Sequence, residues 1–321
     1  MATTVDPRFP GADREGYLET ALGRTWYRVT GELPSLGSDA PAPLVVLHGG
    51  AGAAHNYTLM MANLARADAT SDPARPVRAV VHYDQIGCGA STHLPDAPPE
   101  TWTVGLFVQE LRALVAHLGI ERFHLLGQSW GGMLAPEVVL SDDTGVLSLT
   151  ICDSPASMAL WMAAAEELRT HLPPEVEQTL RQHEEAGTTD SPAYLEAMEV
   201  FYARHVCRVV PNPPEVTDSF AQIQAEPTVY HTMNGPSEFF VVGSLREWSV
   251  VERLEAVTVP TLVVAGEHDE ARPMVWAPFV ERIPGATSHV FPGCSHMPHV
   301  EEPEAFLEVV GGFLARHDPR A

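Results

Sequence analysis

The chain has little positive charge. Its 42 acidic residues outnumber its 19 basic residues, which gives a formal net charge of −23 at pH 7. Such a surface repels nucleic acids and anionic membranes, and it attracts cations into any cleft that focuses the field. We therefore expect neither a nucleic acid nor a membrane as a partner, and a cleft in this protein should favour a cationic ligand.

Cysteines and long apolar segments are scarce as well. The four cysteines, Cys88, Cys152, Cys207 and Cys294, form no C-x-x-C pair, which argues against a zinc site or a redox motif. No apolar segment approaches the length of a membrane span, and residues 1–14 lack the basic and apolar regions of a secretory signal. These absences predict a cytoplasmic protein with reduced thiols, without a metal or cofactor, and they leave its oligomeric state open.

Short apolar segments typical of buried strands alternate with amphipathic segments typical of helices. The alternation predicts an α/β fold with a mostly parallel, doubly wound sheet. Residues 16–30 have the pattern of an antiparallel hairpin, with Gly23 near its turn. The expected strands are residues 44–47, 77–83, 123–126, 147–152, 261–265 and 289–291, and the expected helices are residues 56–66, 104–118, 130–140 and 304–315.

The alternation stops between residues 154 and 245. Helical patterns at residues 159–171 and 192–206 replace the strands there, and prolines mark the joints between them. We therefore expect a core domain made of residues 1–153 and 246–321, with a mostly helical cap domain of residues 154–245 inserted into it.

The most specific motif is Gly127-Gln128-Ser129-Trp130-Gly131, which follows an expected strand and precedes an expected helix. This is the G-x-S-x-G nucleophile elbow of the α/β-hydrolase fold in the strand, turn and helix context that it requires. Glycines let the backbone turn tightly around Ser129, so that its hydroxyl stands clear of the sheet at a helix N-terminus. Ser129 is therefore the candidate nucleophile.

A glycine-rich loop, His48-Gly49-Gly50-Ala51-Gly52, follows another expected strand. The backbone N–H groups of Gly50 and Trp130 are the candidate oxyanion hole, which stabilises the charge of a tetrahedral intermediate. The loop lacks the G-K-[ST] of a phosphate-binding loop. His48 precedes the nucleophile in the chain, so we expect it to shape the loop rather than to act as a base.

In this fold an acid and a histidine follow the nucleophile, in that order. Asp269 comes shortly after the strand 261–265, and His296 comes shortly after residues 289–291, so they are the candidate orienting acid and general base. His299 is a rival for the base, and His268 and Glu267 neighbour the acid. We expect these three to be surface or supporting groups.

Together, the motifs resemble those of the proline iminopeptidases and their relatives among the serine aminopeptidases. The resemblance extends from His48-Gly49-Gly50 to residues 293–296, and residues 84–91 resemble the D-Q-x-G-x-G-x-S loop of that family. It implies a cap that narrows the site, and exopeptidase action that releases one N-terminal residue.

The resemblance also implies carboxylates that hold the α-ammonium of the substrate. Glu238, in the segment Met-Asn-Gly-Pro-Ser-Glu-Phe, and Glu270, next to Asp269, match those positions. A partly desolvated ammonium needs such a negative partner. One departure is Ala51, which stands where the family usually has proline and relaxes the backbone of the loop.

The expected substrate is thus a small peptide or an aminoacyl amide with a free α-amino group. Three alternatives stay open at this point. The chain could be an amino acid amidase or aminoacyl-deprotecting enzyme that acts on a small metabolite, a carboxylesterase that needs neither Glu238 nor Glu270, or a ligand-binding protein without catalysis on a hydrolase scaffold.

Overall fold

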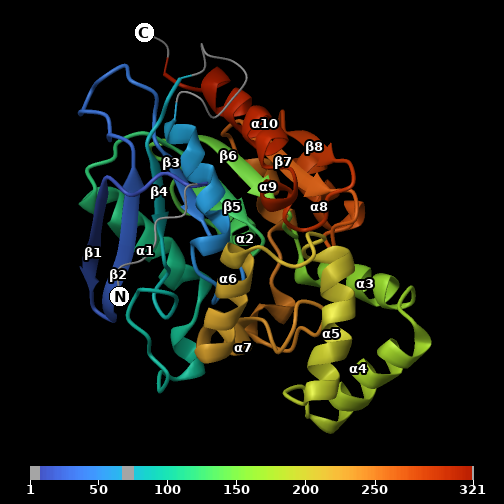
Figure 1. The fold of residues 1–321 in the computed structure, drawn as a ribbon. Coiled ribbons are helices and arrows are strands. Elements are labelled where there is room, and N and C mark those ends of the chain that lie inside the picture. Colours follow the sequence, from blue (N-terminus) through green and yellow to red (C-terminus); the bar gives the residue numbers. More distant parts are fainter. Residues whose placement is uncertain (1–7, 67–75, 320–321) are drawn as a thin grey trace.

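A computed structural model of the chain describes residues 8–66 and 76–319, and within these residues eight strands form one sheet (Figure 1). The spatial order is β1-β2-β4-β3-β5-β6-β7-β8. β2 pairs antiparallel with β1 and β4, and all pairings from β4 to β8 are parallel. The predicted mostly parallel sheet is confirmed. The strands are β1 (Arg14–Thr20), β2 (Gly23–Thr30), β3 (Leu44–Leu47), β4 (Val80–Tyr83), β5 (Phe123–Gln128), β6 (Val146–Cys152), β7 (Thr261–Gly266) and β8 (Thr287–Phe291).

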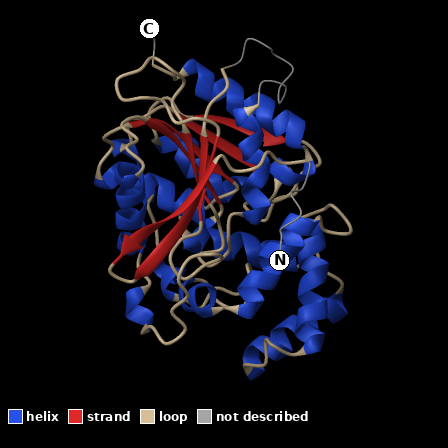
Figure 2. Ribbon diagram, turned by 60° about the vertical axis from the view of Figure 1, so that its left-hand side comes forward, coloured by secondary structure: helices blue, strands red, loops and turns tan. Residues whose placement is uncertain are grey.

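Helices cover both faces of this sheet (Figure 2). The helices and 3-10 segments outside residues 154–245 are η1 (Asn56–Ala65), η2 (Pro99–Thr101), α1 (Val104–His117), α2 (Trp130–Ser141), η4 (Val251–Ala256), α8 (Pro273–Arg282), α9 (Pro298–Glu301) and α10 (Pro303–Arg316). Within residues 154–245 lie the cap helices, a name that we use for α3 (Met158–Arg169), α4 (Pro174–Ala186), α5 (Pro192–His205), α6 (Pro214–Ala225) and α7 (Thr228–Met233), followed by η3 (Ser244–Glu247).

Strand residues alternate between two hydrophobic clusters because successive side chains point to opposite faces of a sheet. On one face, Val45 and Leu47 belong to a cluster that includes buried side chains of α1, α2 and α8. On the other face, Leu44 and Val46 belong to a cluster that includes side chains of η1 and α10. Burial on both faces explains why these strands read as continuous apolar segments.

Two expected elements differ from those observed. The strand expected at residues 77–83 begins only at Val80, because the N–H of Arg78 donates to the carbonyl oxygen of Leu64 instead of joining the sheet. The helix expected at residues 56–66 is a 3-10 segment. There the side-chain amide of Asn63 donates to the carbonyl oxygen of Met60. In an α-helix this oxygen would instead accept from the backbone N–H of Leu64, so the side chain competes with the helix.

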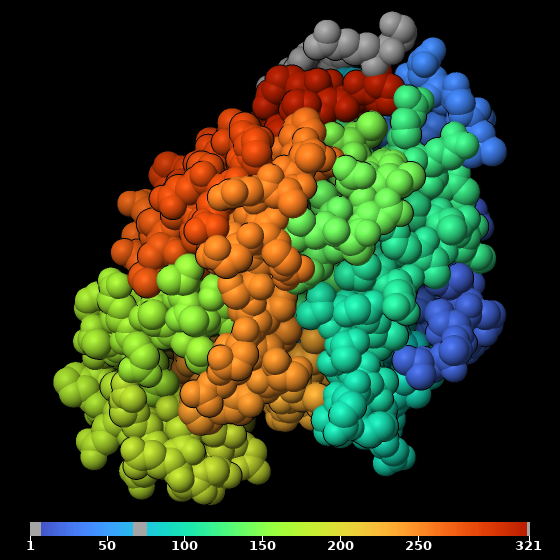
Figure 3. All heavy atoms as spheres, turned by 180° about the vertical axis from the view of Figure 1, so that it is seen from behind, coloured from blue at the N-terminus to red at the C-terminus, as the bar shows by residue number. Residues whose placement is uncertain are grey.

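Side chains of α3, α4, α5 and α6 share a third hydrophobic cluster, whose fully buried members include Leu180, Tyr194, Phe201 and Val216. This cluster also includes Ala53, Tyr57 and Met297 from outside residues 154–245. Seen from behind, the light green to yellow-green part of the cap, around α3 and α4, forms a lobe below the red and orange C-terminal elements (Figure 3). We expect no secretory signal in residues 1–14. Residues 1–7 of this segment lie outside the described part of the chain. Among the described residues, no helix combines the length and apolar character needed to cross a membrane.

Candidate active site

Ser129 occupies a strained turn between β5 and α2. Its φ of 54° and ψ of −120° lie in a region that residues with a side chain seldom adopt. The turn is possible because its neighbours are glycines: a Cβ on Gly127 would lie 2.0 Å from the carbonyl oxygen of Gly131, and one on Gly131 would lie 2.2 Å from that of Leu47. The sequence motif therefore forms the expected elbow at the N-terminus of a helix.

The loop after β3 lies beside this elbow. Gly50 has a φ of 73° and Ala51 a φ of 37°, so the loop turns through the left-handed region at two successive residues. Within the described part of the chain, the backbone N–H groups of Gly50 and Trp130 donate to no protein acceptor. Both residues line the same cavity as Ser129, so two unpaired donors border the space in front of the serine.

Gln85, from the D-Q-x-G-x-G-x-S segment, connects this loop to the elbow. Its side-chain oxygen accepts a hydrogen bond of 2.9 Å from Nε1 of Trp130, and its Nε2 donates to the carbonyl oxygen of His48 over 3.2 Å. The N–H of Gln85 donates in turn to Nε2 of His48 over 3.0 Å. Burial lowers the pKa of His48 to about 4, so the ring stays neutral and serves as part of the loop's framework.

A second network joins the loop to His296. The hydroxyl of Tyr57 accepts from the N–H of Gly49 over 2.7 Å and donates to the side-chain oxygen of Gln128 over 2.5 Å. The side-chain nitrogen of Gln128 donates to the carbonyl oxygen of His296 over 2.9 Å. Tyr57 carried no recognisable signal in the sequence, because a single tyrosine in a 3-10 segment belongs to no motif.

The structure brings Asp269 and His296 together. Nδ1 of His296 lies 2.8 Å from Oδ1 of Asp269, which also accepts from the N–H of Ala271. Burial lowers the pKa of His296, but the charge and hydrogen bond of Asp269 and the charge of Glu238 outweigh it, so the pKa is raised. Nε2 of His296 and the hydroxyl of Ser129 both line one cavity without a hydrogen bond between them, as is common in sites without substrate.

The rival residues lie elsewhere. His299 is buried, with rings of Tyr57 and Phe306 at centroid distances of 5.6 and 5.7 Å, and burial lowers its pKa to about 3. Glu267 is exposed and accepts from the N–H of Gly293, and His268 is half-buried beside it.

Asp153 is a buried carboxylate that the sequence analysis missed. It follows β6, has a φ of 52°, and is fully buried. Burial and the neighbouring charge of Asp269 raise its pKa well above the ordinary value. Its carboxyl group lies next to the side chain of Asp269 and the backbone of Gly266. A signal existed, since an Asp directly after an expected parallel strand lies at the sheet edge where sites form.

Glu238 and Glu270 lie close to the same histidine. Oε1 of Glu270 is 4.0 Å from Nε2 of His296, and Glu238 lines both cavities that contain Ser129. Burial raises the pKa of Glu238, and burial together with the charges of Glu238 and Asp269 raises the pKa of Glu270 well above the ordinary value. Both oxygens of Glu270 are buried without a hydrogen-bond partner in the described structure.

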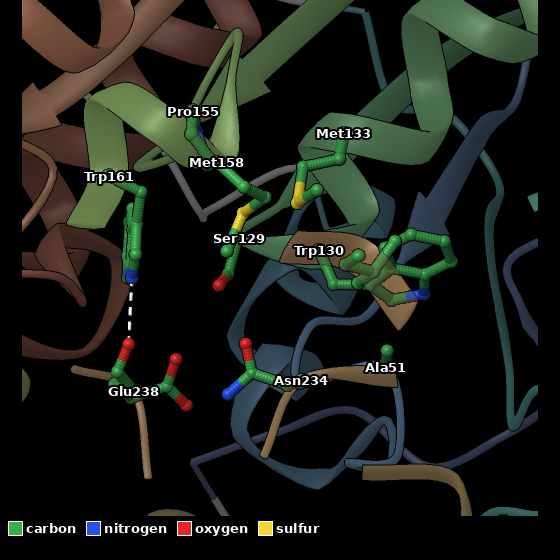
Figure 4. A pocket seen from close by; sticks show the side chains of 11 residues that line it. Ala51, Ser129, Trp130, Met133, Pro155, Met158, Trp161, Asn234 and Glu238 are labelled. Carbon is green, nitrogen blue, oxygen red and sulfur yellow. Dashed lines mark hydrogen bonds between the residues drawn. The ribbon is translucent and has the colours of Figure 1, made fainter. Parts of the chain in front are cut away.

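Figure 4 shows the first of these cavities, which we call the acyl cavity. The hydroxyl of Ser129 points into it, with Trp161 on one side and Trp130 on the other. Nε1 of Trp161 donates to the backbone oxygen of Glu238 over 2.7 Å, which fixes both groups at its edge. The cavity volume is about 20 Å³, little more than the space of one water molecule.

Within residues 8–66 and 76–319, no three His, Cys, Asp or Glu side chains are grouped so that they could hold a metal ion.

The fold and the elbow define a class of protein. Residues 42–303 match the α/β-hydrolase fold family, so the chain is an α/β hydrolase. It is 34% identical over 307 residues to a proline iminopeptidase of Lactobacillus helveticus, an alignment that covers 95% of this chain and 98% of that protein.

Two solved structures are more similar still. The crystal structure of proline iminopeptidase from Mycobacterium smegmatis is 55% identical, with a TM-score of 0.85, over 95% of this chain and 99% of that one. The crystal structure of VinJ is 45% identical, with a TM-score of 0.89, over 96% of this chain and 100% of that one. The chain belongs to the proline iminopeptidase family, whose members are hydrolases of the aminopeptidase type, and the resemblance found in its motifs is confirmed.

Proposed function

We propose that Ser129, His296 and Asp269 act as a catalytic triad. Ser129 Oγ attacks the carbonyl carbon of the substrate while Nε2 of His296 takes its proton, and Asp269 fixes the imidazole and stabilises its charged form. The N–H groups of Gly50 and Trp130 stabilise the oxyanion. The C–N bond then breaks, His296 returns the proton to the leaving amine, and water hydrolyses the ester on Ser129.

We further propose that Glu238 and Glu270 bind the free α-ammonium of the substrate. The observation that carries this proposal is the pair of carboxylates beside His296, of which Glu270 is fully buried without a hydrogen-bond partner in the described structure. A buried carboxylate is costly unless it meets a positive charge, and an ammonium ligand supplies one. The function is therefore hydrolysis of the amide bond that follows an N-terminal residue with a free α-amino group, in a small peptide or an aminoacyl amide.

The acyl cavity supports a small released residue such as proline or alanine. Its volume of about 20 Å³ leaves little room, and its apolar walls include Met133, Met158 and Trp161. Glu238 reaches the site from the segment between residues 154 and 245, so this segment acts as the cap that narrows it. All four cysteines are buried free thiols, which supports a reducing, cytoplasmic location.

The test is a set of aminoacyl-4-nitroanilides with free and with acetylated α-amino groups. We expect hydrolysis of the free forms and little of the acetylated forms. Equal rates on both would favour the carboxylesterase alternative, in which Glu238 and Glu270 bind nothing. A fluorophosphonate probe addresses the remaining alternative, because a binding protein without catalysis should not be labelled at Ser129.

A further inference from the structure

A second cavity in front of Ser129 lies on the side of His296. We call it the leaving-group cavity, because the leaving amine takes its proton from this histidine. Ser129 and His296 both line it, whereas the acyl cavity does not include His296. Its remaining walls are largely apolar and include Val206, Val216 and Met297.

A much larger cavity adjoins it between α5, α6 and α7. We call it the cap groove. Its volume is about 340 Å³, against about 30 Å³ for the leaving-group cavity. Three residues line both cavities: Phe220, Ile223 and Glu238. The cap groove thus continues from the side on which the leaving group departs.

The same tyrosines line the cap groove and hold Glu238. The hydroxyl of Tyr230 donates to Oε1 of Glu238 over 2.7 Å, and the N–H of Glu238 donates to the hydroxyl of Tyr202 over 3.2 Å. Both tyrosines are wall residues of the groove, together with Leu195 and Met198. An apolar group in the groove would therefore pack against the residues that orient the proposed ammonium site.

The charges that line the leaving-group cavity and the cap groove disfavour an anionic leaving group. No arginine lines the leaving-group cavity or the cap groove, and the whole sequence contains no lysine. The charged wall residues are Asp190, Glu199 and Glu238, besides His296. Partial burial lowers the pKa of His231, another wall residue, and so favours its neutral form. The free carboxylate of a short peptide would meet only repulsion here.

We propose that the cap groove binds the leaving group, and that the preferred leaving group is a bulky apolar amine without a negative charge. This inference rests on the proposed function and narrows its substrate class to N-aminoacyl derivatives of apolar amines. One water molecule is consumed: its oxygen joins the acyl carbon, and the amine departs with a proton from His296.

The test uses two matched series of substrates with the same N-terminal alanine. The first is a series of alanyl n-alkylamides from butyl to octyl. We expect kcat/KM to rise by about tenfold or more along it, because each buried methylene contributes favourably. The second pairs the tripeptide Ala-Leu-Leu with its C-terminal amide, and we expect the amide form to be hydrolysed faster.

Variants on α6 place the effect in the groove. Ile223→Arg puts a cation on the wall shared by both cavities, so it should abolish the gain from longer alkyl chains and improve the free-acid tripeptide relative to its amide. Ile223→Gln adds no charge and should abolish only the gain from longer chains. The matched control is Gln222→Arg, which adds the same charge at an exposed position that lines neither cavity. It should leave both substrate ratios as in wild type.

The outcomes separate the two proposals. If no substrate with a free amine is hydrolysed, the proposed function itself fails. If these substrates are hydrolysed but alkyl length has no effect, or the free-acid tripeptide is preferred, the function stands and the inference about the groove is overturned. Equal responses of Ile223→Arg and Gln222→Arg would also overturn it.

Discussion

Oε1 of Glu270 lies 4.0 Å from Nε2 of His296, while Nδ1 on the opposite side of the ring lies 2.8 Å from Oδ1 of Asp269. The imidazole therefore lies between two carboxyl groups, and the charge of Glu238 also raises its pKa. Glu238, which in the proposed function receives the substrate's ammonium, thus also stabilises the protonated imidazole. In the proposed function, substrate binding and proton transfer are therefore linked.

This link predicts the pH dependence of activity. His296 must be neutral to act as a base, and its pKa is raised above 6.5. We therefore expect kcat/KM to rise with pH, and the midpoint of this rising limb to lie above pH 6.5. Glu238→Gln removes one of the charges that raise this pKa, so the limb should move to lower pH. Rate profiles measured on a neutral ester, which needs no ammonium, would show the shift directly. A limb that moved to higher pH in the variant would contradict the role of Glu238.

The nucleophile and base are tested by three alanine variants. Ser129→Ala and His296→Ala should each lower kcat by at least about 10⁴-fold, because triad members act as one unit. His299→Ala is the control: it should lower the melting temperature through lost packing yet keep most of the activity of the folded fraction. An inactive but folded His299→Ala together with an active His296→Ala would reverse the assignment of the base.

The ammonium site is tested by Glu238→Gln and Glu270→Gln. Either change removes one partner of a desolvated charge pair and should cost about 2–5 kcal/mol of transition-state stabilisation. We expect kcat/KM on a free aminoacyl anilide to fall accordingly. The N-acetylated anilide is the control, since it has no ammonium to lose, and its slow hydrolysis should change little. Similar losses on both anilides would indicate a general disturbance of the triad instead.

The motifs predicted the residues that meet at the sheet edge, because each follows a strand and parallel strands end at one edge. Ser129, Asp269 and His296 could be found in this way. Tyr57 could not, since its role depends on a contact with Gln128, 71 residues away in the chain. Element bounds were less accurate where side chains compete for backbone groups, as Asn63 does in η1.

A partly buried ion pair near the C-terminal end of the described chain predicts a stability change in acid. Asp318 binds Arg78 over 2.8 Å and His124 over 3.1 Å. Burial alone would raise its pKa, but hydrogen bonds from His124 and Arg78 lower it to about 2. The contribution of ionised Asp318 to the free energy of unfolding is therefore complete above about pH 4 and is lost as the pH falls towards 2.

Denaturant unfolding at several pH values measures this contribution. Asp318→Asn should lose about 2 kcal/mol of unfolding free energy at neutral pH, and the difference from wild type should shrink towards pH 2. A difference that stays constant down to pH 2 would show that the charge of Asp318 is not the cause.

The last prediction concerns Asp153, which neighbours Asp269 at the end of the adjacent strand. Its raised pKa favours the protonated form, whose hydroxyl can donate to Oδ2 of Asp269, an oxygen without a hydrogen-bond partner among the described residues. Asn is a matched neutral replacement, because its amide can donate in the same place and it tolerates a positive φ. Asp153→Asn should therefore keep most of the activity and leave the pH limb of His296 in place. Asp153→Ala leaves the buried Oδ2 unpaired at a cost of about 1–3 kcal/mol, so kcat should fall while KM changes little. If Asp153 were ionised instead, Asp153→Asn would remove a repulsion from Asp269 and change the pH limb, and the profiles of the two variants would reveal it.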